Sequence, residues 1–235
     1  QTIADVAKEL MAEFTIDSVG VSAAGFVSSD RKTMLATPNI AGWNGVDLDY
    51  QLTSLIGLPV VIENDANAAA WGEARFGAGR GKEHMLMLTV GTGIGGGIIV
   101  NGELYRGAYG IAAEIGHLRV VPEGHLCGCG ARGCFEQYGS GNALMRHARE
   151  AIAASPDIAR NLLSRGDGTL EGLTGKAITD AARDGDAVAL AAFNTTAQWL
   201  GAGIATLSVI LDPECVVIGG GVIDALNMHL EPRRA

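Results

Sequence analysis

A cysteine-rich stretch between Glu114 and Glu136 restricts the fold of this chain more than any other part of the sequence. Three of the four cysteines lie there, and His117 precedes them on the same stretch. Three thiolates and one imidazole are a complete ligand set for a closed tetrahedral Zn²⁺ site, and the interleaved glycines permit tight turns around an ion. We predict a structural zinc ion held by His117, Cys127, Cys129 and Cys134, with His125 as the alternative fourth ligand.

Disulfide bonding is the other explanation for clustered cysteines. No secretory signal is visible, and in a cytosolic chain this pattern more often binds metal. One residue alone separates Cys127 from Cys129, which disfavours a bond between them. Zinc binding is therefore the favoured interpretation.

The composition excludes some classes of partner. The 235 residues carry a net charge of −9 and contain no basic block, which argues against nucleic acid as a partner. No apolar run reaches membrane-spanning length without charged or turn residues. No targeting segment is apparent, so the cytoplasm is the expected location.

Apolar periodicity predicts alternating helices and strands, and hence the α/β class. The predicted strands are 18–25, 58–65, 84–90 and 214–222, with a hairpin turn at Asn101-Gly102. The predicted helices are 3–14, 47–55, 66–76, 137–154, 176–183 and 186–211, the last as one helix or a pair. We place a hinge near residues 65–68, which gives a small α/β lobe at 1–67 and a larger lobe at 68–235.

Asp65 follows a buried strand and precedes a helix. Ligands of α/β sheets sit beyond the carboxyl ends of strands, so this position suits a catalytic carboxylate. An ordinary helix N-cap explains the same residue equally well.

Two glycine-rich turns also follow predicted strands. In the turn 91–97, backbone N–H groups near Thr92 and Gly93 could cradle a phosphate, although a tight hairpin needs glycine too. In the second turn, Gly219, Gly220 and Gly221 would let a flat ligand such as adenine lie against the backbone.

Five motifs, in this order, resemble the ROK family of sugar kinases and regulators, and among its members the bacterial glucokinases of the actinobacterial type. They are VVIENDANAAAWGE, LTVGTGIGGGIIVNGELYRG, AAEIGH, CGCGARGCFEQYGSG and VVIGGGV. The resemblance runs over essentially the whole chain. It implies an α/β fold of the actin-like ATPase (ribonuclease H-like) type with two lobes.

The resemblance also implies an activity and a set of site residues. The activity is transfer of the γ-phosphoryl group of ATP to the 6-hydroxyl of glucose, with Mg²⁺. Asp65 would be the general base. Sugar hydroxyls would be bound by Asn64, Asp65, Glu114, His117 and Glu136. ATP phosphate would meet Thr92 and Gly93, and the adenosine would meet Gly219, Gly220 and Gly221. A homodimer or homotetramer is expected.

The chain departs from the family pattern at both ends. The family begins with an Asp-x-Gly-Gly-Thr phosphate motif and continues with helices after VVIGGGV. Neither is present here, so we expect a fragment that binds sugar and zinc but phosphorylates poorly. The alternatives are a sugar-sensing transcriptional regulator, a kinase for mannose, N-acetylmannosamine or fructose, use of polyphosphate as donor, and a zinc-binding interaction module.

Overall fold

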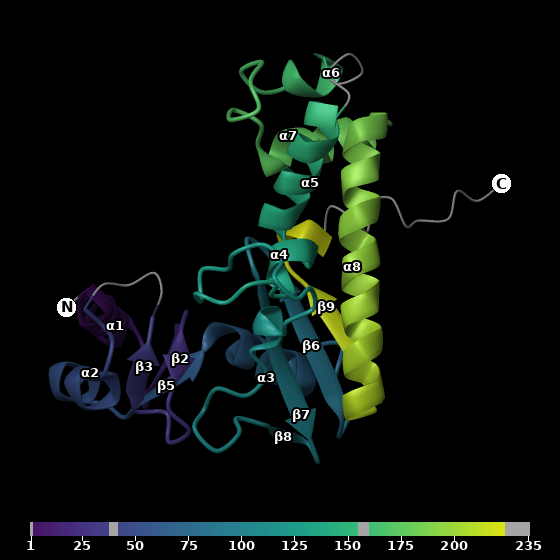
Figure 1. Cartoon of the computed structure of the whole chain (residues 1–235). Coiled ribbons are helices and arrows are strands. Elements are labelled where there is room, and N and C mark those ends of the chain that lie inside the picture. Colours follow the sequence, from purple (N-terminus) through teal and green to yellow (C-terminus); the bar gives the residue numbers. More distant parts are fainter. Residues whose placement is uncertain (1, 38–41, 155–159, 224–235) are drawn as a thin grey trace. The chain divides into compact units, whose positions relative to one another are not determined.

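The computed structural model describes residues 2–37, 42–154 and 160–223, and it confirms the predicted mixture of helices and strands (Figure 1). The chain divides into two compact units. The first unit contains Gln1–Leu86 and Gly96–Glu114, and the second contains Met87–Gly95 and Ile115–Ala235. Helix α3 (Asp65–Phe76) packs on strands of the first unit, and the lobes proposed at 1–67 and 68–235 stay a prediction.

The first unit is built on a parallel pair of strands, β1 (Val19–Ala23) and β5 (Val60–Asn64). Two helices flank this pair, α1 (Thr2–Glu13) and α2 (Leu48–Ile56). The Asp47 carboxylate caps α2, and Gly57 ends it in the left-handed conformation. A small antiparallel sheet joins β1 to α2 through β2 (Phe26–Val27), β3 (Thr33–Ala36) and β4 (Val46–Asp47).

Alternation along the parallel strands decides which side chains form the core of the first unit. On β5, Val60 and Ile62 are buried, whereas Val61 between them is exposed. Met34 and Leu52 belong to the same buried cluster. This core fixes the carboxyl end of β5, where Asn64 and Asp65 begin α3.

A four-stranded sheet has the order β8-β7-β6-β9. Its members are β6 (Met85–Val90), β7 (Ile94–Val100), β8 (Glu103–Leu104) and β9 (Cys215–Gly219). The predicted turn between β7 and β8 is confirmed, and both Asn101 and Gly102 have positive φ, at 52° and 73°. The strand β6 is buried along almost its whole length.

Helices dominate the second unit. They are α4 (Glu136–Gly139), α5 (Gly141–Ala154), α6 (Arg160–Leu163), α7 (Gly175–Arg183) and α8 (Ala187–Leu211), with a short 3₁₀ turn, η1 (Ile115–His117). The helices α5 and α7 pack on α8 around a buried cluster that includes Leu144, Ile178 and Phe193.

Two helix predictions are refined by the structure. The predicted helix 137–154 is interrupted at Ser140, whose hydroxyl accepts a hydrogen bond from the Ala143 N–H at 3.2 Å and so caps a new helix. The segment 186–211 forms one helix, capped by Asp186 and ended by Asp212 in the left-handed conformation. Among the described residues, no helix combines the length and apolarity that crossing a membrane would require.

Candidate functional site

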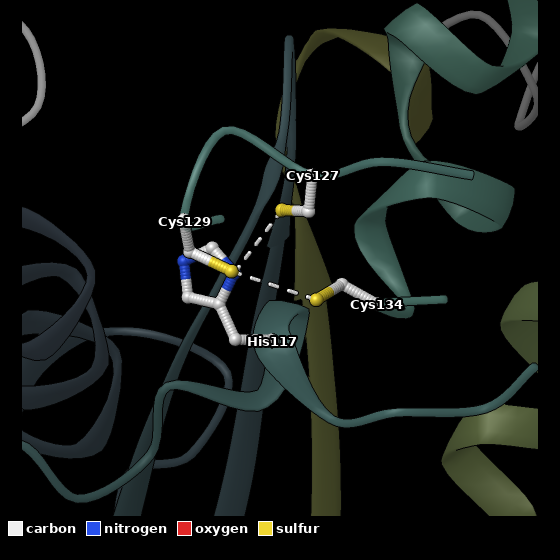
Figure 2. A group of neighbouring side chains, drawn as sticks. All are labelled: His117, Cys127, Cys129 and Cys134. Atoms are coloured by element: carbon white, nitrogen blue, oxygen red, sulfur yellow. Dashed lines mark hydrogen bonds between the residues drawn. The ribbon is translucent and has the colours of Figure 1, made fainter. Parts of the chain in front are cut away.

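The predicted metal ligands come together in the second unit (Figure 2). One ligand atom from each of His117, Cys127, Cys129 and Cys134 lies within 4.8 Å of the others. The Cys127 Sγ is 3.6 Å from His117 Nδ1, and the Cys129 and Cys134 sulfurs are 3.6 Å apart. Three sulfurs and one imidazole nitrogen at this spacing fit a tetrahedral zinc ion, which thiolate and imidazole ligands favour.

His125, the alternative fourth ligand, is held elsewhere. Its backbone N–H donates to the Tyr138 hydroxyl at 3.0 Å, and its ring packs against the Tyr138 ring with centroids 5.4 Å apart. His117 reaches the sulfurs because η1 carries it to them from outside the cysteine loop. Of the two histidines, His117 is the one whose ring joins the described cluster.

The cysteine loop closes through backbone pairing and through a glycine at residue 133. Isolated bridges join Arg119 to Cys134 and Leu126 to Arg132. Gly133 has φ 78°, and a Cβ there would collide with the Val121 carbonyl oxygen. The loop conformation that assembles the thiols therefore depends on the absence of a side chain at residue 133.

The environment of the thiols differs along the loop. Burial raises the pKa of the Cys127 thiol, and the neighbouring Glu136 carboxylate raises it further. Burial also raises the pKa of the Cys134 thiol. Burial opposes ionisation of Cys129, but hydrogen bonds from the Ala131 N–H and the two other thiols outweigh it, so the Cys129 pKa is lowered. A cation is thus the natural partner that would hold all three as thiolates.

Glu136 connects the cysteine cluster to the glycine-rich turn after β6. The Cys127 thiol donates to Glu136 Oε1 at 3.0 Å. The other oxygen, Oε2, lies 2.6 Å from where a Cβ on Gly93 would stand. Gly93 therefore admits the carboxylate beside the turn, and a predicted sugar ligand and a predicted phosphate-binding residue are neighbours within this unit.

The two predicted nucleotide-binding turns meet at the start of α5. The Gly141 N–H donates to the Gly91 carbonyl at 2.8 Å, and the Asn142 N–H donates to the Thr92 carbonyl at 3.3 Å. At the end of β9, Gly220 has φ 106°, and a Cβ there would lie 2.5 Å from the Val90 carbonyl oxygen. A Cβ on Gly221 would meet nothing within 4 Å. The second unit thus presents bare backbone beside these turns.

The predicted base lies in the first unit, at the junction of β5 and α3. Asp65 is exposed, and its Oδ1 accepts a hydrogen bond from the Ala66 N–H at 2.9 Å. Asn64, rather than Asp65, is the N-cap of α3, since its Oδ1 accepts from the Asn67 N–H at 3.0 Å. The Asn64 amide also donates to the Gly25 carbonyl at 3.0 Å. With the capping role filled by Asn64, the Asp65 carboxylate is not needed to start the helix.

Glu114 is the last residue of the first unit. It follows Ala113, a non-glycine residue with φ 66°. Gly25, which was not among the predicted site residues, holds the Asn64 amide, and a Cβ on Gly25 would lie 2.7 Å from the Ala36 carbonyl oxygen. Gly25 ends the predicted strand 18–25, and the small residues at that end are the signal that could have marked it.

Comparison with known proteins identifies the family. The ROK family model matches residues 1–234. A glucokinase of Streptomyces coelicolor is 49% identical over 219 residues, which are 93% of this chain and 69% of that protein. A solved ROK glucokinase of Streptomyces griseus, in complex with glucose and AMPPNP, is also 49% identical, with a TM-score of 0.84 over 95% of this chain and 73% of that one.

Regulators of the same family are less similar. The xylose repressor of Bacillus subtilis is 32% identical, over 92% of this chain and 51% of the repressor. The structural match to the glucokinase confirms the actin-like ATPase fold class that the motifs imply. The chain belongs to the ROK family.

Proposed function

We propose that this protein is a hexose kinase that transfers the γ-phosphoryl group of ATP to the 6-hydroxyl of glucose. The observation that carries the proposal is the 49% identity to glucokinases, one of which was solved with glucose and an ATP analogue. The residues fit this chemistry. Exposed or half-buried acceptors suit a sugar with several hydroxyls, and bare glycine backbone suits a nucleotide.

Asp65 is proposed as the general base. Its carboxylate lies at the carboxyl end of β5 and is open to solvent, as a base that meets an incoming hydroxyl must be. It would take the proton of the sugar 6-hydroxyl as the oxygen attacks the γ-phosphorus. Asn64, Glu114, His117 and Glu136 would orient the sugar by hydrogen bonds to its other hydroxyls, and Thr92 and Gly93 would contact the ATP phosphates.

Zinc is proposed as a structural ion, held by His117, Cys127, Cys129 and Cys134. Four protein ligands leave no position open for catalysis. With Nδ1 of His117 facing the sulfurs, the opposite ring nitrogen is left to bind a sugar hydroxyl. Glu136 accepts from Cys127, so the cluster would also fix this carboxylate. Mg²⁺ bound with ATP would neutralise charge on the transferring phosphoryl group. The expected homodimer or homotetramer and the cytoplasmic location stay predictions.

A coupled assay for ADP release, with glucose and ATP, tests the proposal. Asp65→Asn should lower turnover by about 10²- to 10⁴-fold, because the base is lost, while glucose binding measured by calorimetry stays detectable. Near-normal turnover of Asp65→Asn would remove Asp65 from the role of base. Asn101→Asp is the control. It adds a carboxylate at an exposed turn that is distant in sequence from Asp65, and it should leave turnover unchanged.

The assay also separates the alternatives. A panel of glucose, mannose, N-acetylmannosamine and fructose identifies the sugar, and polyphosphate in place of ATP tests the donor. A regulator would be recognised by DNA binding of the full-length protein, since poor turnover is also expected of a kinase fragment. The identity of 49% to glucokinases against 32% to a xylose repressor favours the kinase.

A further inference from the structure

A half-buried ion pair in the first unit has no part in the function described above. Arg106, just after β8, donates to Glu63 of β5 from Nε at 2.9 Å and from Nη2 at 2.7 Å, both to Glu63 Oε2. The two side chains are only 27% and 15% exposed. The pair joins segments 43 residues apart, and two short charge-assisted bonds from one planar guanidinium fix the orientation of the carboxylate.

The second oxygen of Glu63 contacts the residues on either side of Asp65. Glu63 Oε1 accepts from the Asn64 N–H at 3.2 Å and from the Asn67 amide at 3.4 Å. Asn67 is buried, and its own N–H donates to Asn64 Oδ1. No described group donates to Asn67 Oδ1. The side-chain amide of Asn67 is therefore oriented by the hydrogen bond that its nitrogen donates to Glu63.

We propose that Arg106 is a positioning residue for the sugar-binding end of β5. It orients Glu63, and Glu63 fixes the Asn64–Asn67 turn that carries Asp65. The inference rests on the proposed function in one respect, the role of Asp65 as base. If Arg106 is lost, the Glu63 carboxylate loses its partner in the ion pair and turns toward water. Its hydrogen bonds to Asn64 and Asn67 are then lost, and Asp65 moves from the place where it meets the sugar.

The same unit supplies a matched control pair. Arg75 of α3 and Glu103 of β8 form an ion pair of 3.5 Å, but their side chains are 45% and 77% exposed. Exposed pairs of this kind contribute little to stability. Arg75→Met and Glu103→Gln therefore remove the same types of charge, from a pair that joins α3 to β8 and has no described contact with the Asn64–Asn67 turn.

Substitution of Arg106 is sterically mild. A cavity of about 550 Å³ beside the pair is lined by Arg106, Glu63, Trp71, Arg31 and neighbouring strand residues. A methionine at residue 106 can enter this space, so Arg106→Met should fold. Arg106→Lys keeps the positive charge but loses the planar guanidinium. This variant should therefore keep part of the positioning of Glu63 that Arg106→Met loses.

The experiment measures hydrogen exchange and kinetics on the same purified proteins. In Arg106→Met and Glu63→Gln, amide protection of a peptide covering residues 63–68 should fall at least tenfold, while peptides from α2 and β1 keep theirs. The kcat/KM for glucose should fall on the order of 10²-fold, the cost of a misplacement of about 1 Å. The KM for ATP should stay unchanged, and Arg75→Met and Glu103→Gln should match the unmodified protein in every measurement.

Two results would overturn the inference. One is unchanged exchange at residues 63–68 in Arg106→Met. The other is a loss of protection spread evenly over the first unit, which would mark Arg106 as a general stabilising residue. A local loss of protection in a protein that never phosphorylates glucose would refute the proposed function and leave the positioning role intact.

Discussion

Ala113 stores backbone strain immediately before a predicted sugar ligand. Its φ of 66° lies in the left-handed region, which costs a residue with a Cβ about 1–2 kcal/mol. Ala113→Gly removes that cost but adds freedom to the unfolded chain. We expect the free energy of unfolding, measured by urea denaturation, to rise by up to about 1 kcal/mol. Asn101→Gly is the control. Because asparagine tolerates a φ of 52° well, this variant should gain less free energy of unfolding than Ala113→Gly. Destabilisation by Ala113→Gly would mean that the alanine methyl group packs usefully.

Single residues also mark the limit of prediction from sequence. The clustering of the three cysteines could be predicted because their spacing is local, but which histidine joins them depends on where Tyr138 and η1 place the rings of His117 and His125. Arg106 and Glu63 carry no motif that pairs them. Their contact exists only because β8 and β5 approach in the folded unit, so no reading of neighbouring residues could have found it.

At the scale of one element, the cysteine loop should depend on Gly133 and be indifferent to Gly128. A methyl group at residue 133 collides with the Val121 carbonyl oxygen and must adopt φ 78°, whereas one at residue 128 meets nothing within 4 Å. Gly133→Ala should therefore lose most bound zinc, measured by elemental analysis, and should melt at a lower temperature. Gly128→Ala should keep both properties. Equal zinc content in the two variants would show that the loop adapts to a side chain at residue 133.

Elements with a strong apolar period were predicted with the right type, and most of their ends were predicted to within two residues. The strand 58–65 and the helix after it appear as β5 and α3, because burial of Val60 and Ile62 and the Asn64 cap agree with the pattern. The break at Ser140 was missed, since the helical period continues through it and only a side-chain cap marks the new start. The short strands β2, β3 and β4 were not among the predicted strands, because their pairing outweighs a weak local preference.

At the scale of the whole molecule, each unit has a core of its own. One buried cluster runs from Ala4 to Ile62, and the other runs from Leu144 to Phe193. The metal cluster belongs to the second unit, and Asp65 belongs to the first. Loss of the metal should therefore act on the second unit alone, although the proposed function needs residues from both.

Cys129→Ser tests this separation with little damage to packing, because Cys129 is exposed whereas Cys127 and Cys134 are buried. The variant should lose zinc, and its glucose affinity by calorimetry should fall about 10- to 100-fold, as when groups that orient a ligand are released. Amide protection should fall in residues 115–136 and stay unchanged in β1 and β5. Cys215, the fourth cysteine, lies in β9 outside the cluster. The control variant Cys215→Ser should therefore keep both zinc and glucose binding. Zinc loss with unchanged glucose affinity would separate the metal from the sugar site, and protection lost equally in β1 would show that the two units unfold together.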